Sequence, residues 1–360
     1  MGTDLFPMLS IRAKASSQNK GLMVFGKKGV LLVNLGTPNS PTRGDVYVYL
    51  REFLTDPRVI DIPWLPRQLL VKGIIAPFRS GSSAKLYQEL WTPDGSPIKI
   101  YGERVAVGVQ ELLGDDYVVE LGMRYQNPSI ESALKKLLAK QVSEITVLAL
   151  FPQYASATTG SVHDEVMRLL RKEQTIPSVR FINSYYDHAP MIEIFADNAR
   201  QFDIDSYDHI LFSYHGLPQR QLRKADACNH CLKSADCCES ISLKNQFCYS
   251  AQCYGTTKAI ASLLNLPRER YTTCFQSRLG RDPWAQPYTS EVIEKLGHGG
   301  AKRLLVFSAA FVADCLETII EIGREYQEEF EKMGGEKVDL VPSLNDDPRW
   351  IKVVAEMVKG

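Results

Sequence analysis

Short runs of apolar residues recur along the chain without the polar alternation of half-exposed strands. Eight of them are rich in Val, Ile and Leu: residues 29–36, 117–125, 144–152, 179–185, 209–216, 271–277, 303–311 and 337–344. Continuous apolar runs of this length are typical of strands that a parallel sheet buries on both faces. The pattern therefore predicts eight buried strands.

Segments with helical periodicity fill most intervals between these runs. They cover residues 43–54, 98–113, 129–138, 162–171, 191–201, 256–264 and 316–333. Alternating strands and helices are typical of an α/β fold built from right-handed βαβ units. For 360 residues, two Rossmann-like domains, each with a four-stranded parallel sheet flanked by helices, fit the length better than one wide sheet.

The same pattern gives an expected domain organisation. We expect a first domain over residues 28–193 and a second over residues 194–342, with a helix in residues 343–360 packing back on the first. Residues 1–27 contain no long apolar stretch and are expected to form a disordered extension. Residues 221–250 are polar, rich in Cys and longer than an ordinary connection, which indicates an insert in the second domain.

Charge and hydropathy limit the partners. The 42 basic residues balance the 42 acidic ones, so no general field favours nucleic acid. No apolar run reaches the roughly 18 to 20 residues that span a bilayer, and no secretory signal is recognised, so we expect a cytoplasmic protein. Residues 65–78 are apolar and basic, which fits either a cleft lip that touches a membrane or ordinary core packing.

Two polar clusters follow strands, at the carboxyl ends where α/β sheets bind ligands. The motif SYHGLP (213–218) ends the fifth run, so His215 is a candidate base or metal ligand. After the seventh run comes FVADCLETIIE (311–321), where Asp314 is a candidate N-cap and Glu317 and Glu321 follow on the same helical face. Such a stripe is either a solvated first turn or, when partly buried, a path for cations or protons.

Both motifs resemble the signature stretches of the ferrochelatase family. Further segments are similar to the family in the same order: residues 33–63, GSPIKI (95–100), GMRYQNPSI (122–130), FPQYASATTGS (151–161) and QSRLGRDPWAQP (276–287). The resemblance covers about residues 28–358 except the Cys-rich insert. Cys315 departs from the pattern, because many family members carry His at this position.

The resemblance implies insertion of Fe²⁺ into protoporphyrin IX, which yields protohaem and two protons without an organic cofactor. It also implies that His215 and Glu317 form the site for the ferrous substrate, and that Glu321 and Asp314 take part in catalysis. The residues matched to the porphyrin-binding cleft are Leu35, Ser96, Arg124, Tyr125, Tyr154, Trp284 and Phe311. Among these, Ser96 and Arg124 are the candidate polar contacts and the others are candidate walls.

Five of the eight cysteines lie in the insert. Cys228, Cys231, Cys237, Cys238 and Cys248 form the pattern C-x2-C-x5-C-C-x9-C, which is typical of a soft-metal site. Resemblance to ferrochelatases with an internal Cys-rich insert implies a [2Fe–2S] cluster, with structural zinc or free thiols as alternatives. Because neighbouring cysteines rarely ligate one small site together, we expect four ligands, with only one from the pair at 237 and 238.

Other functions remain open at this point. The nearest are a coproporphyrin ferrochelatase and a chelatase for another metal or tetrapyrrole; MRYQNPSI and the length of residues 63–83 favour protoporphyrin. A haem-binding or metal-complex-binding protein without catalysis is the alternative from another class. The sequence predicts no oligomeric state.

Overall fold

The structure, a computed structural model, describes residues 26–280 and 282–360, so the extension expected over residues 1–27 lies almost entirely outside the described residues. The first sheet contains β1 (Lys28–Gly36), β2 (Tyr117–Tyr125), β3 (Glu144–Ala149) and β4 (Ser178–Ile182). All its strands are parallel in the order β2-β1-β3-β4, and Leu32 at the centre of β1 pairs with Leu121 and Leu148.

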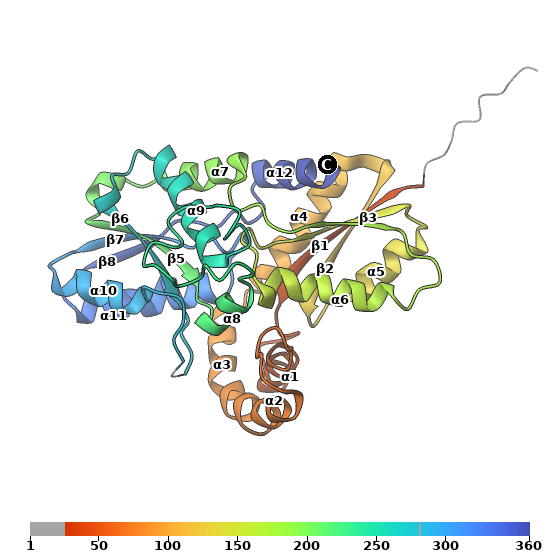
Figure 1. The fold of residues 1–360 in the computed structure, drawn as a ribbon, viewed down its shortest axis with the longest axis horizontal. Coiled ribbons are helices and arrows are strands. Elements are labelled where there is room, and N and C mark those ends of the chain that lie inside the picture. The colour runs from red at the N-terminus through yellow and green to blue at the C-terminus, as the bar shows by residue number, and fades with distance from the viewer. Residues whose placement is uncertain (1–25, 281) are drawn as a thin grey trace, which may run out of the picture.

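The second sheet repeats this arrangement. Its strands are β5 (His209–His215), β6 (Tyr271–Gln276), β7 (Arg303–Phe307) and β8 (Lys337–Leu340). They are parallel in the order β6-β5-β7-β8, and the central strands β5 and β7 are buried over nearly their whole length. The predicted fold class, two four-stranded parallel sheets flanked by helices, is confirmed (Figure 1).

The helical elements of the first half include one group that the periodicity did not predict. The elements are α1 (Arg43–Leu54), α2 (Trp64–Leu70), π-helix η1 (Val71–Ile75), α3 (Ala76–Leu90), α4 (Pro97–Leu113), η2 (Gly114–Asp116), α5 (Ile130–Ala139), η3 (Ser156–Gly160) and α6 (Ser161–Leu170). The group formed by α2, η1 and α3, which we call the lip (residues 64–90), projects with α1 away from the two sheets (Figure 1).

The second half contacts the first half through the C-terminal helix. Its elements are α7 (Ala189–Ala199), η4 (Ile204–Ser206), α8 (Gln219–Lys224), α9 (Tyr249–Leu263), η5 (Arg268–Arg270), α10 (Thr289–His298), π-helix η6 (Glu317–Tyr326), α11 (Gln327–Lys332) and α12 (Pro348–Lys359). The C-terminal α12 contacts α4 of the first half, in agreement with its expected place. The expected boundary between residues 193 and 194 falls inside the continuous helix α7 and stays a prediction.

One apolar cluster joins the two halves. It contains Leu32 and Leu148 of the first sheet, Phe212 and Phe307 of the second, and Trp350 of α12. Because these side chains are almost fully buried, the cluster resists separation of the sheets. None of the helices in the described ranges has the length and apolar character needed to span a bilayer.

Candidate active site

His215 stands at the carboxyl end of β5, where the strand order of the second sheet reverses. Its Nδ1 lies 2.8 Å from the carbonyl oxygen of Gly216, so Nδ1 carries the hydrogen and donates it. In the neutral imidazole the other ring nitrogen, Nε2, keeps its lone pair, which can accept a proton or bind a metal ion. The bond to Gly216 therefore fixes the orientation of the ring and leaves Nε2 as the nitrogen available for chemistry.

Trp284 lies beside this imidazole, with 6.5 Å between the ring centres. The two loops are joined, because Pro218 and Trp284 form a backbone bridge and the N–H of Ala285 donates to the carbonyl of Leu217 at 2.8 Å. The structure thus brings together two residues that the sequence places 69 positions apart, as the motif assignments expected.

The helix after β7 differs from the expectation. Residues 317–326 form a π-helix with i to i+5 hydrogen bonds, so the regular α-helical stripe of three carboxylates does not form. Asp314 lies before this helix and is held there by Asn345, whose Nδ2 donates to Oδ2 at 2.8 Å, and by Thr318, whose hydroxyl donates to Oδ1 at 3.2 Å. Asp314 therefore anchors the start of the helix, which corrects its expected place on a shared carboxylate face.

The two remaining carboxylates have different surroundings. Glu321 accepts hydrogen bonds from the Ser277 hydroxyl at 2.7 Å and from Gln276 Nε2 at 3.1 Å, at the end of β6. Glu317 is half-buried and lines a cavity of about 40 Å³. Glu321 is thus fixed to the strand end, whereas Glu317 faces the cavity.

The cavity beside Glu317 collects three of the expected cleft residues. Leu35, Ser96 and Phe311 all line it, and the hydroxyl of Thr37 donates to that of Ser96 at 2.9 Å. Its volume has room for about one water molecule.

Two tyrosines that the sequence reasoning missed also line this cavity. Burial raises the pKa of Tyr49, with the neighbouring Tyr87 and then the charge of Glu317 adding to the rise. Burial and Glu317 likewise raise the pKa of Tyr87. Both phenols stay protonated and can serve as hydrogen-bond donors beside Glu317. The only sequence feature that could have indicated these tyrosines is the position of Tyr49 in the predicted helix after the first strand.

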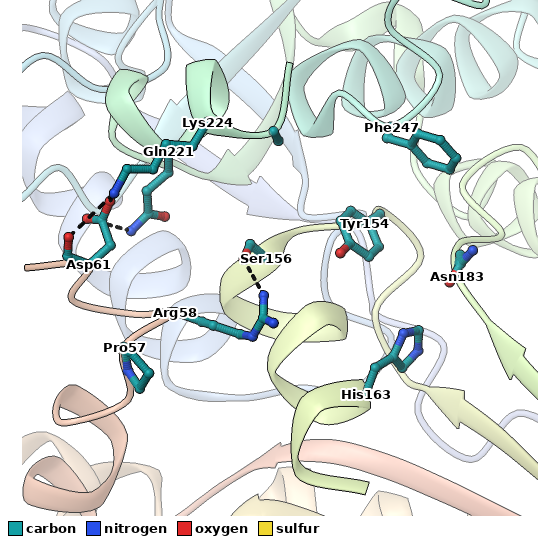
Figure 2. Close-up of a pocket in the computed structure, with 11 residues that line it drawn as sticks. Pro57, Arg58, Asp61, Tyr154, Ser156, His163, Asn183, Gln221, Lys224 and Phe247 are labelled. Atoms are coloured by element: carbon teal, nitrogen blue, oxygen red, sulfur yellow. Dashed lines mark hydrogen bonds and ion pairs between the residues drawn. The ribbon is translucent and has the colours of Figure 1, made fainter. Parts of the chain in front are cut away.

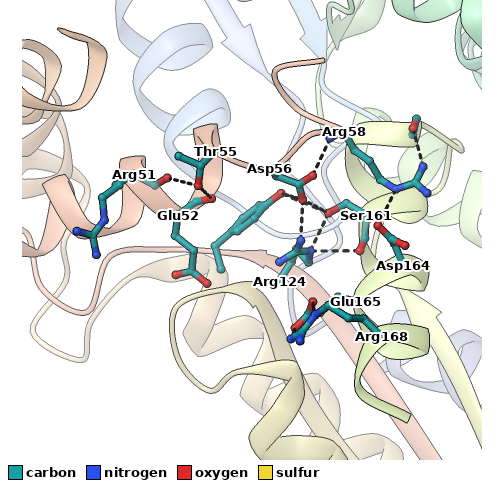
Figure 3. Close-up of polar contacts among 12 residues, drawn as sticks. Arg51, Glu52, Thr55, Asp56, Arg58, Arg124, Ser161, Asp164, Glu165 and Arg168 are labelled. Atoms are coloured by element: carbon teal, nitrogen blue, oxygen red, sulfur yellow. Dashed lines mark hydrogen bonds and ion pairs between the residues drawn. The ribbon is translucent and has the colours of Figure 1, made fainter. Parts of the chain in front are cut away.

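Arg124 and Tyr125 do not face this cavity. Figure 3 shows Arg124 beside Asp56, whose side chain is only 3% exposed. Arg124 donates to Asp56 Oδ2 at 2.7 Å and to the Ser161 hydroxyl at 2.7 Å, while the Tyr125 hydroxyl donates to the same Asp56 oxygen at 2.9 Å. Tyr125 has no exposed surface, which corrects its expected place in the cleft wall. The two side chains instead bind the loop after α1 to α6.

Tyr154 lines a different and larger cavity, of about 540 Å³ (Figure 2). Residues of both halves surround this cavity, with Arg58 and His163 from the first and Lys224 from the second. Its cations are already paired: Arg58 with Asp164, and Lys224 with an aspartate of the first half. Burial, with the Arg58 charge second, lowers the pKa of His163 to about 4, so this imidazole is neutral at pH 7.

The cysteines of the insert gather around one cavity. Four of the five candidates, Cys228, Cys231, Cys237 and Cys248, line a space of about 210 Å³. The fifth, Cys238, is not among its lining residues, although its sulfur lies 3.7 Å from that of Cys237. Within the described ranges, no three His, Cys, Asp or Glu side chains are arranged to hold a metal ion. The donor chemistry fits a soft metal group, but a closed ligand cage is not formed.

The thiols of this segment differ in acidity. Burial raises the pKa of Cys231 to about 11. Cys248 occupies the N-cap position of α9, and the neighbouring Cys238 thiol, followed by backbone N–H groups of the first turn, lowers the pKa of Cys248. The pKa values of Cys231 and Cys248 are thus shifted in opposite directions.

The two sheets, with a site at their carboxyl edges, define a chelatase-type two-domain protein. The sirohydrochlorin chelatase SirB from Bacillus subtilis subspecies spizizenii, solved in complex with cobalt, matches with a TM-score of 0.52 over 92% of this chain and 94% of that one. The sequence identity is 11%, so this likeness shows the fold alone.

Sequence comparison identifies the family. The ferrochelatase family model matches residues 27–360. The ferrochelatase of Legionella pneumophila subsp. pneumophila strain Philadelphia 1 is 45% identical over 332 residues, which cover 92% of this chain and 98% of that protein. The ferrochelatase of Coxiella burnetii strain Dugway 5J108-111 is 46% identical over 334 residues, covering 92% and 93%. The chain therefore belongs to the ferrochelatase family, and the resemblance noted in the sequence is confirmed.

Proposed function

We propose that the protein inserts Fe²⁺ into a porphyrin and releases the two pyrrole protons, as the final step of haem formation. The observation that supports this most is the imidazole of His215, which the bond from Nδ1 to the Gly216 carbonyl orients at the carboxyl edge of β5, with Nε2 left for a proton or a metal ion. The charges balance, because one divalent ion replaces two protons. Iron stays ferrous, so the reaction requires neither an oxidant nor an organic cofactor.

His215 and Glu317 are the proposed pair for the ferrous substrate. A neutral imidazole nitrogen accepts a pyrrole proton or presents iron, and a carboxylate carries protons or Fe²⁺. Glu321 is the proposed next proton acceptor, because its carboxylate lies on the same helix and is held by Ser277. Asp314 supports the pair indirectly by fixing the start of that helix.

The ring is proposed to lie between the lip and the edge of the second sheet. Leu35 and Phe311, which line the cavity at Glu317, and Trp284, which lies beside His215, are the proposed walls, and Ser96 is the proposed polar contact. A rigid aromatic wall can hold a macrocycle buckled, which exposes the nitrogen lone pairs to the entering metal.

Protoporphyrin IX is the proposed substrate, with coproporphyrin as the alternative. The preference rests on the resemblance of MRYQNPSI and of residues 63–83 to protoporphyrin enzymes. Competition between the two porphyrins for limiting enzyme tests it. A higher kcat/KM for coproporphyrin would reverse the assignment.

Anaerobic incubation with Fe²⁺ and protoporphyrin IX tests the function itself. An enzyme converts the porphyrin spectrum to that of haem with multiple turnovers, whereas a haem-binding protein shifts the spectrum once without conversion. We expect His215→Ala to bind porphyrin normally but to retain less than about a tenth of the turnover, because its imidazole acts on the ring nitrogens. Greater retention would contradict the role of His215.

A [2Fe–2S] cluster is proposed for the cysteine cavity, with zinc as the alternative. Cys228, Cys231, Cys237 and Cys248 are the proposed ligands, since all four line one space. Such a cluster supplies reversible one-electron chemistry, which iron insertion does not require. Ordering of the polar insert is therefore its proposed contribution.

The proposed location of the protein is the cytoplasm. Residues 65–78 are the proposed site of a peripheral contact with a membrane. Leu65, Leu69, Ile74 and Phe78 are all more than half exposed, and Phe78 reaches 80%. Exposed apolar patches of this kind mark interaction surfaces. Sedimentation with phospholipid vesicles tests the contact, and Phe78→Ser should weaken it. Unchanged sedimentation of this variant would contradict it.

A further inference from the structure

The cavity beside Glu317, where the proposed function places the porphyrin, is narrow, and the lip forms part of its wall. The cavity beside Glu317 measures about 40 Å³, and Tyr87 and Leu90 of the lip form part of its wall. Ligand sites for molecules of this size usually enclose about 300 Å³ or more. The lip must therefore shift when a porphyrin enters, and the contacts that hold it decide how firmly the ring is gripped.

Asp61 holds the root of the lip, three residues before α2 begins. Arg220 Nε lies 2.8 Å from its Oδ1, and the ammonium of Lys224 pairs with its Oδ2. Gln221 donates to the nearby Val59 carbonyl at 3.0 Å. Figure 2 shows Asp61 facing Gln221 and Lys224. All three partners belong to α8 of the other half, so these bonds cross between the two halves.

The helix α8 is joined in turn to the metal-site side. It begins at Gln219, directly after the SYHGLP motif, and Gln219 Nε2 donates to the Trp284 carbonyl at 3.2 Å. Arg220 also pairs with Asp282 of the Trp284 loop, at 2.6 Å. Asp61 thus connects the root of the lip to the elements that carry His215 and Trp284.

The far end of the lip is held more weakly. Glu89, near the end of α3, pairs with Arg324 of the π-helix, and their side chains are 48% and 38% exposed. The Asp61 side chain is only 11% exposed, although its partners Arg220 and Lys224 are 39% and 63% exposed, and these two cations hold its pKa below the usual range against the effect of burial. A shielded carboxylate with two charge-assisted bonds is held more firmly than a carboxylate in one exposed pair. The lip is therefore more firmly fixed at its root than at its other end.

Ion pairs within the protein also argue against an anion site in the cavity of about 540 Å³ that Tyr154 lines. Lys224 is neutralised by Asp61, and Arg58 by Asp164. These charges serve contacts within the protein and leave no excess positive charge for a ligand.

We propose that Asp61 is a positioning residue that holds the root of the lip against α8 and so sets the affinity for the porphyrin. This inference deepens the proposed function and rests on it. Asp61 does not touch the reacting atoms; it acts through the lip, which yields at its Glu89 end when the ring enters.

Asp61→Asn in the full chain tests the proposal, because it removes the charge at nearly constant volume. We expect the Kd for iron-free protoporphyrin IX and the KM to rise about tenfold, equivalent to about 1.4 kcal/mol, with kcat within about twofold. Hydrogen exchange should accelerate in residues 64–90 and not in the two sheets. Lys224→Gln, which removes one partner from the other side, should give a smaller change in the same direction.

Asp282→Asn is the matched control. It also removes a partner of Arg220, but the Asp61 bonds to α8 and the Gln219 bond to the Trp284 carbonyl remain, so Kd and lip exchange should stay within about twofold of wild type. Unchanged Kd and lip exchange in Asp61→Asn would overturn the proposal, as would equal effects of Asp282→Asn or faster exchange throughout both sheets. If Asp61→Asn does not fold, a wild-type Kd in Lys224→Gln overturns it. Failure of the wild type to insert iron would instead contradict the proposed function.

Discussion

The hydroxyl of Tyr249 donates a hydrogen bond of 2.8 Å to the backbone carbonyl oxygen of His215. Tyr249 directly follows Cys248 and begins α9, so this bond ties the end of the cysteine segment to the backbone of the proposed metal-site histidine. The insert therefore contacts the proposed active site through the Tyr249 hydroxyl as well as through α8.

Tyr249→Phe should lower both stability and turnover. Removing the hydroxyl leaves the His215 carbonyl without this donor, which costs about 1 kcal/mol of unfolding free energy. We expect kcat to fall roughly fivefold, since a displacement of the imidazole reduces proton transfer, while the Kd for porphyrin is unchanged. Tyr254→Phe on the same helix is the control. Equal losses in both variants would point to general destabilisation of α9.

Glu317 and Glu321 should respond differently to removal of the charge. Glu317→Gln deletes a proton acceptor that lines the cavity, so kcat should fall by roughly 10²-fold or more. The kcat of Glu321→Gln should fall less, because Ser277 and Gln276 already hold that carboxylate by hydrogen bonds. Steady-state turnover under anaerobic conditions measures both. Equal losses would indicate a distributed proton relay.

Asp56 should matter for stability far more than its exposed neighbour Asp164. Asp56→Asn leaves the Arg124 guanidinium without its buried carboxylate, and breaking a buried pair in this way costs about 3–5 kcal/mol. Asp164→Asn removes an exposed partner of Arg58 and should cost no more than about 1 kcal/mol. Figure 3 shows both carboxylates. Urea unfolding measures the stability of both variants, and similar midpoints would refute the buried pairing.

His163 should make stability fall in mild acid. Its pKa is lowered to about 4 in the folded protein, against an ordinary value of 6.5, so the unfolded chain binds more protons between these values. Its neutral, folded form is therefore favoured above pH 6.5, and this contribution is lost as the pH falls toward 4. His163→Gln should flatten the difference in unfolding free energy between pH 7 and pH 5. A variant with the wild-type slope would exclude the His163 contribution.

The sequence predicted the elements whose burial follows a simple period. The strand at 117–125 and the helix at 43–54 have the predicted bounds, because each turns apolar residues toward a core. Residues 65–78 were recognised as a possible lip, but the helices of the lip were not predicted, because Pro66, Gly73 and Pro77 interrupt the segment and several of its apolar side chains are exposed. The π-helix was read as α because its sequence carries no separate periodic signal.

The sequence predicted the site residues that belong to recognisable motifs, but not the positions of side chains that bind residues far away in the sequence. His215 and Trp284 lie together as their motifs indicated. Arg124 and Tyr125 turn away because Asp56, 68 and 69 positions earlier, supplies a buried carboxylate for both. No local pattern reveals such a pairing, which only the folded chain creates.

The neighbouring cysteines Cys237 and Cys238 should separate in function. Cys237 lines the cavity with the other three candidate ligands, whereas Cys238 is not among the lining residues. If a [2Fe–2S] cluster is bound, the isolated protein should be coloured, bleached by dithionite and contain about two iron atoms per chain. Cys237→Ser should abolish colour and iron, as should Cys228→Ser and Cys231→Ser. Cys238→Ser should retain both, because the remaining four thiols complete the ligand set.

A colourless wild type with one zinc per chain would favour the zinc alternative, and a metal-free, fully active wild type would reject a metal site in the insert. Loss of iron in Cys238→Ser with retention in Cys237→Ser would reverse the assignment of the pair.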